Sequence, residues 1–106
     1  MRYIKTFEKK KRKPEQFDYV VCLPGGIDFV EDNFGQIIHN ELFVNPDGQM
    51  ELFYYVEYKN VPEKLKENFE NYYGADCFIV IEDEILYWSK NKEDVESYLA
   101  TKKYNL

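Results

Sequence analysis

The chain has 106 residues and a formal net charge of -6, and 44% of its residues are hydrophobic and 18% aromatic. This length fits one domain, and the high hydrophobic content excludes intrinsic disorder of the whole chain. The two cysteines are too few for a disulfide-dense scaffold or for a four-thiolate metal site.

Charge is divided unevenly along the chain. Residues 1–13 hold seven basic residues and one acidic residue, a net charge of +6, whereas residues 14–106 carry -12. The basic arm consists of Lys9, Lys10, Lys11, Arg12 and Lys13. Like charges repel along a helix or strand, so we expect a loop or an edge strand here. The arm either contacts phosphates or folds back onto the acidic body.

Residues 14–59 are predicted to form a β-rich half. Residues 16–23 are rich in β-branched and aromatic types and favour a strand, which the Pro24-Gly25-Gly26 turn ends. A second short strand is expected over residues 27–29. The clearest unit is a hairpin of residues 34–45 and 50–59. The intervening Asn45-Pro46-Asp47-Gly48-Gln49 suits a three-residue turn with a bulge.

The turn fixes the register of this hairpin, and the register separates two faces. The even-numbered face is apolar and is predicted to be core, with the pairs Val44–Met50, Leu42–Leu52, Asn40–Tyr54 and Ile38–Val56. The odd-numbered face is acidic and aromatic, with the pairs Phe43–Glu51, Glu41–Phe53, His39–Tyr55 and Ile37–Glu57. Either a helix or the N-terminal segment covers this odd face, or it is an exposed recognition surface. The predicted partner-binding residues are Glu41, Glu51, Phe53, Tyr55, Glu57 and His39.

Residues 60–106 are predicted to form a helix, a hairpin and a second helix. Pro62 and Gly74 suit the two ends of a helix over 62–73, and Leu65, Phe69 and Tyr72 fall on one face at helical spacing, which predicts that they pack inward. The apolar run within 76–82 favours a central strand, and Glu82-Asp83-Glu84 is expected to turn the chain into a hairpin with 85–88.

The last element predicted is a helix over 92–103, with Asn91 as its N-cap and Val95, Tyr98 and Leu99 facing inward. The expected fold is therefore α+β: a single domain, residues 1–106, with an antiparallel sheet of β-hairpins and two helices of the C-terminal half packed on it.

Residues typical of catalysis or metal binding are few. His39 is the one histidine, and Cys22 and Cys77 lie in apolar segments that favour buried, reduced thiols, although a disulfide between them stays open. Their spacing matches no zinc site, and Pro24-Gly25-Gly26 lacks the residues of a phosphate loop. The acidic clusters at 28–32 and 82–84 favour solvated turns. We expect that the protein is not an enzyme and that it binds neither a cofactor nor a metal.

Electrostatics gives the strongest functional signal. Residues 14–58 contain nine acidic residues and no Lys or Arg, which predicts a negative field that attracts basic partners. We predict a small acidic protein-interaction module, an inhibitor of a basic, nucleic-acid-binding surface whose carboxylates replace phosphates. In composition alone it is similar to phage and mobile-element inhibitors of host defence. The alternatives are a nucleic-acid-binding accessory protein that uses the basic arm, and a toxin-neutralising immunity protein.

The longest apolar run, residues 77–81, is far shorter than the ~20 residues of a membrane span. No apolar segment typical of a signal peptide follows the basic arm. We therefore expect a cytoplasmic protein, of a bacterial or host cell, that does not contact the membrane.

Overall fold

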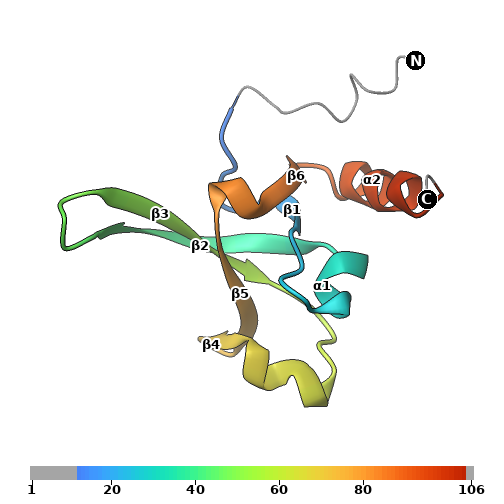
Figure 1. Ribbon diagram of the computed structural model, residues 1–106. Helices are drawn as coiled ribbons and strands as arrows, with labels where there is room; N and C mark the ends of the chain where they lie inside the picture. Colours follow the sequence, from blue (N-terminus) through green and yellow to red (C-terminus); the bar gives the residue numbers. More distant parts are fainter. Residues whose placement is uncertain (1–11, 105–106) are drawn as a thin grey trace.

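A six-stranded antiparallel sheet forms the centre of the computed structural model, which describes residues 12–104 (Figure 1). The strands in chain order are β1 (Tyr19–Cys22), β2 (Gly35–Val44), β3 (Met50–Glu57), β4 (Glu70–Tyr72), β5 (Ala75–Ile81) and β6 (Ile85–Ser89). Their order in the sheet is β4-β5-β3-β2-β1-β6, and every neighbouring pair is antiparallel. With a helix near the C-terminus, this architecture confirms the predicted α+β class.

Helices and 3₁₀ turns connect and cover the strands. They are α1 (Asp28–Asp32), a 3₁₀ helix at Glu63–Asn68, a 3₁₀ turn at Glu82–Glu84, and α2 (Lys92–Tyr104). The position and inward face of α2 are as predicted: it packs on β1 and β6, and Val95 is fully buried.

Two predicted elements are wrong. The short strand expected over residues 27–29 is instead the start of α1, whose residue Val30 is fully buried in the main core. The helix expected over 62–73 is a 3₁₀ helix that ends at Asn68, because Phe69 has an extended backbone and begins the approach to β4. Leu65 and Phe69 still pack into the core, so the apolar spacing marked buried residues correctly but not their backbone conformation.

The predicted second hairpin is also wrong. β5 lies between β3 and β4, so both of its edges are occupied, and β6 pairs with β1 instead. The 3₁₀ turn redirects the chain: the Glu84 side chain accepts a hydrogen bond from the Ile81 N–H at 3.0 Å, and the Glu84 carbonyl accepts one from the Leu23 N–H at 2.8 Å. The chain thereby leaves β5 and reaches β1.

The β2–β3 hairpin is confirmed, together with most of its register. The Asn45 N–H donates to the Gln49 carbonyl at 2.6 Å, Gly48 has a φ of 91°, and the predicted pairs hold from His39–Tyr55 to Val44–Met50. A β-bulge between Ile37 and His39 then shifts the pairing, so that Ile37 faces Val56 and Gln36 faces Glu57. The predicted pairs Ile38–Val56 and Ile37–Glu57 are therefore wrong, because one extra residue moves Ile37 onto the core face.

The core lies on the even-numbered face of β3 but does not reach the tip of the hairpin. Tyr54 and Val56 are fully buried and Leu52 packs against the core. The predicted core residues Leu42, Val44 and Met50 are instead 55%, 66% and 66% exposed. Figure 1 shows the reason, since the tip of the hairpin projects away from α1 and the rest of the body.

Candidate protein-interaction surface

The odd-numbered side chains of the hairpin lie together on one side of the sheet. We call this surface the acidic-aromatic face; it consists of His39, Glu41, Phe43, Glu51, Phe53, Tyr55, Glu57 and Tyr72. The six predicted binding residues are all on it, because the register from His39 to Phe43 is as predicted and Glu57 follows Tyr55 by strand alternation. Glu57 faces Gln36 rather than Ile37.

Glu41 is the polar centre of the acidic-aromatic face. One of its carboxylate oxygens, Oε1, accepts a hydrogen bond from the Tyr55 hydroxyl at 3.5 Å and lies 3.5 Å from His39 Nε2. Partial burial raises the pKa of the Tyr55 phenol, and the Glu41 charge raises it further. The phenol therefore stays protonated at neutral pH and donates to the carboxylate.

Aromatic rings surround this carboxylate. The His39 ring stacks on Tyr72 with a centroid distance of 5.1 Å and an interplanar angle of 17°, and it meets Tyr55 edge-on at 5.1 Å. Closer to the tip, Phe43 and Phe53 form an edge-to-face pair at 5.1 Å. These ring contacts pack the aromatic side chains of the face against one another.

Tyr72 is a component of this face that the sequence prediction missed. We assigned it to the inward side of a helix, but it ends β4 and packs on His39 and Tyr55. Tyr73 follows it at the β4–β5 turn, is 92% exposed, and contacts the Tyr72 ring edge-on at 4.7 Å. Tyr72 pairs with Ala75, so β4 and β5 are joined by a two-residue hairpin turn. The sequence does not indicate this turn, because the first of its two residues is tyrosine.

Tyr73 adopts a left-handed backbone conformation that is unfavourable for tyrosine. Its φ is 52° and that of Gly74 is 89°, as a turn with two left-handed residues requires, and Asn rather than Tyr is favoured at the first of them. We expect Tyr73→Asn to raise the free energy of unfolding by about 0.5–1 kcal/mol, measured by urea denaturation. A variant that gains no stability would contradict this cost of the left-handed backbone at Tyr73.

Part of the same side of the sheet is covered. α2 packs on Val21 and Tyr87, which belong to β1 and β6. The acidic-aromatic face lies beyond it on β2, β3 and β4, where Glu41 and Phe43 are exposed and the other members are half-buried. Lys59 lies 3.3 Å from Glu57, so one of the three predicted acidic residues has an ion-pair partner within the chain.

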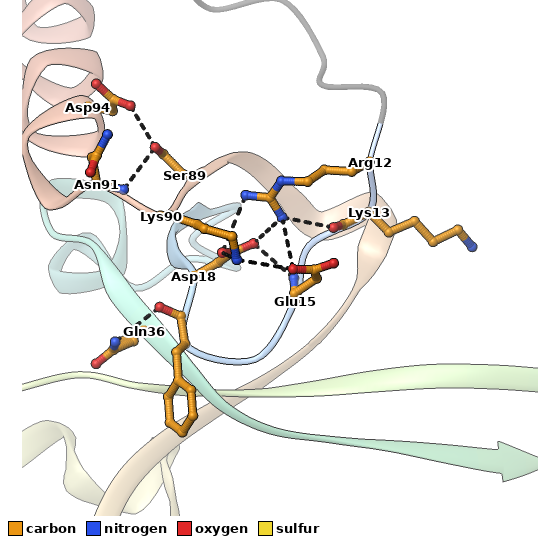
Figure 2. A network of polar contacts seen from close by, with 10 residues as sticks. Arg12, Lys13, Glu15, Asp18, Gln36, Ser89, Lys90, Asn91 and Asp94 are labelled. Atoms are coloured by element: carbon orange, nitrogen blue, oxygen red, sulfur yellow. Dashed lines mark hydrogen bonds and ion pairs between the residues drawn. The ribbon is translucent and has the colours of Figure 1, made fainter.

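The described part of the basic arm is bound to the protein's own acidic residues. Arg12 Nη1 donates to Asp18 at 2.7 Å and lies 3.7 Å from Glu15 (Figure 2). Lys13 Nζ lies 3.7 Å from Glu82. The remaining arm residues, Lys9, Lys10 and Lys11, lie outside the described residues. Arg12 and Lys13 thus pair within the chain, in the way expected if the arm folds back.

The two cysteines have the properties of buried, unreactive thiols. Cys22 and Cys77 are both buried and both free, so no disulfide joins them. Burial raises the pKa of Cys22 to about 12 and that of Cys77 to about 11. Both therefore stay protonated at neutral pH, where the thiolate is the reactive form.

Between residues 12 and 104, no three His, Cys, Asp or Glu side chains are placed to hold a metal ion together. In the same part of the chain, no helix is long and apolar enough to span a membrane. No protein-family model matches the sequence, and comparison with curated proteins and with solved structures found no significant match.

Proposed function

We propose that this chain is a non-enzymatic protein-interaction module whose acidic-aromatic face binds a basic surface of another protein. The observation that carries the proposal is the position of Glu41, an exposed carboxylate that lies among packed aromatic rings. Residues 14–58 contain no Lys or Arg, and Lys59 pairs with one acidic residue of the face, Glu57. Carboxylates raise the rate and selectivity of encounter, and the rings supply the contact energy.

In its more specific form, the proposal is that the partner's surface normally binds nucleic acid. Carboxylates on a strand scaffold then occupy the positions of phosphates, and the chain acts as an inhibitor in the cytoplasm of a bacterial or host cell. Small, acidic inhibitors of host defence carried by phages and mobile elements are the class that this composition favours.

The test reverses the charge of the face. We expect the triple variant Glu41→Lys, Glu51→Lys and Glu57→Lys to lose at least a hundredfold in affinity for a partner identified by affinity capture, because like charges then face each other. Titration calorimetry at two salt concentrations measures the loss, and binding of the unchanged protein should weaken as salt rises. Competition with the partner's nucleic acid tests the specific form.

A second triple variant, with the same change in net charge at other positions, is the matched control. Glu31, Glu63 and Glu67 are exposed acidic residues of α1 and the 3₁₀ helix, which pack on the opposite side of the sheet. Replacing all three with Lys should leave affinity within about threefold. If both triple variants bind as the unchanged protein does, or if both lose affinity equally, the acidic-aromatic face is not the binding surface.

A further inference from the structure

The outer edge of β2 is unpaired along the projecting half of the hairpin. β1 pairs with β2 only at Gly35 and Gln36, with further hydrogen bonds to Ile37 and from the Gln16 side chain to Ile38. Among the described residues, no strand pairs with β2 on that side from residue 39 to residue 44. An edge of this length is a template for a further strand.

The register shows which backbone groups the edge offers. In an antiparallel pair, residues that bond the partner alternate with residues whose N–H and C=O point the opposite way. The Asn45 N–H bonds to Gln49 across the hairpin, so Glu41 and Phe43 also point toward β3. Asn40, Leu42 and Val44 therefore direct their N–H and C=O groups outward, away from β3.

The side chains that flank this edge differ between the two faces. On one face, an added strand would lie beside His39, Glu41 and Phe43, and on the other beside the exposed apolar side chains of Leu42 and Val44. Residues 39–51 include three acidic residues and no Lys or Arg. An added strand that alternates basic and apolar residues would match both faces.

A second copy of this chain matches the edge poorly. Antiparallel pairing of two β2 edges would bring Glu41 and its copy onto the same face of one continuous sheet, with no cation from residues 39–51 between them. Like charges in neighbouring strands destabilise a sheet. Charge complementarity thus selects a partner of opposite charge.

We propose that the β2 edge binds an extended segment of a partner protein by β-strand addition, and that this segment alternates basic with apolar residues. This rests on the proposed function and specifies its binding mode. Backbone hydrogen bonds to Asn40, Leu42 and Val44 supply affinity, and the two faces supply the sequence preference.

The probe is a synthetic peptide of about seven residues in which Lys and Val alternate, with a Glu-Val peptide as its charge control. Amide hydrogen exchange of the full chain, followed by NMR, gives the readout. The Lys-Val peptide should slow exchange at least tenfold at Asn40, Leu42 and Val44. It should leave Glu41 and Phe43 nearly unchanged, because β3 already binds their amides. Absence of peptide binding, or protection without this alternation, overturns the proposal.

A pair of variants tests the backbone contribution. Asn40→Pro removes an outward N–H from an exposed edge position, whereas Asn40→Thr retains it. With the fold verified by circular dichroism, the proline variant should bind the Lys-Val peptide at least tenfold more weakly than the threonine variant. Equal affinity of the two variants overturns strand addition.

Other occupants give distinct results. Protection of the three outward amides in the peptide-free chain, independent of concentration, means that the chain's own residues 1–11 cover the edge. Protection that rises with protein concentration means a second copy. Either result overturns the proposal. A further outcome is that the peptide binds the unchanged chain without protecting the amides of the β2 edge, and does not bind the glutamate triple variant. That result overturns strand addition alone and leaves the proposed function standing.

Discussion

Replacing Arg12 with alanine is expected to lower the free energy of unfolding by about 3 kcal/mol, measured by urea denaturation. The carboxylate of Asp18 is fully buried, and Arg12 donates to both of its oxygens, at 2.7 Å and 3.4 Å. The hydrogen bond to Asp18 raises the pKa of Arg12, which keeps the guanidinium charged. Without Arg12, the partners that remain for the buried charge among residues 12–104 are the Glu15 N–H at 2.9 Å and the largely exposed Lys90 at 3.5 Å.

A neighbouring residue of the same arm provides the control. Lys13 is 75% exposed and lies 3.7 Å from Glu82, so Lys13→Ala should change stability by no more than about 0.5 kcal/mol. The double variant Arg12→Met, Asp18→Leu should be more stable than Arg12→Ala alone, because no unpaired charge stays buried. If Arg12→Ala behaves like Lys13→Ala, the ion pair is not important for the fold.

This distinction affects how the basic arm is tested. Arg12 and Lys13 belong to one run of five basic residues in the sequence, but Arg12 neutralises a buried carboxylate. A truncation that removes residues 1–13 would therefore confuse nucleic-acid binding with loss of stability. Removing only residues 1–11 leaves the Arg12–Asp18 pair in place and tests phosphate binding by the rest of the arm.

Local turn chemistry made the hairpin predictable. Pro46, Asp47 and Gly48 favour one turn type, and the turn type fixes the pairs up to His39–Tyr55. The bulge was not predictable, because Ile37 and Ile38 are adjacent apolar residues and either could be placed in the core. The segment that precedes β1 decides between them, because the Phe17 N–H donates to the Ile37 carbonyl and the Ile37 N–H donates to the Asp18 carbonyl.

Contacts distant in sequence account for the other differences. The pairing of β6 with β1 joins residues 85–89 to 19–22, and nothing near Glu82-Asp83-Glu84 indicates that partner. The exposure of Leu42 and Met50 likewise depends on where α1 and the 3₁₀ helix end beneath the sheet. Tyr72 was assigned to a helix because its spacing from Leu65 and Phe69 is helical, yet strand pairing with Ala75 determines its position.

The candidate surface was predictable to the extent that it lies on one hairpin. Strand alternation placed Glu41, Phe53 and Tyr55 on one face from sequence alone. Tyr72 and Tyr73 come from a different hairpin, so their contribution required the tertiary structure. The sequence therefore predicted the acidic residues of the face and only part of its aromatic surface.

Gly35→Ala is expected to destabilise the protein by about 3 kcal/mol, because the base of the β2–β3 hairpin has no room for a methyl group. A Cβ at this position would lie 2.8 Å from the Glu57 carbonyl oxygen, closer still to Val56 Cγ1, and 3.0 Å from Tyr58 Cε1. The φ of Gly35 is not positive, so alanine is compatible with its backbone and would stabilise the fold by about 0.4–1 kcal/mol if space allowed. The steric clash with β3 outweighs this gain, because the carbonyl belongs to a strand paired on both sides and cannot move alone.

Gly48→Ala is a control that tests the cost of backbone conformation without a steric clash. A Cβ at Gly48 meets nothing within 4 Å, but its φ of 91° disfavours alanine, so the expected loss is only about 1 kcal/mol. Urea denaturation of both variants compares the two costs directly. Equal losses would mean that β2 shifts to accept the methyl group, and such a shift would also displace His39 from Tyr55 and change their NMR chemical shifts. A larger loss at Gly35 with those shifts unchanged would mean that β2 does not move and that the clash with β3 is not relieved.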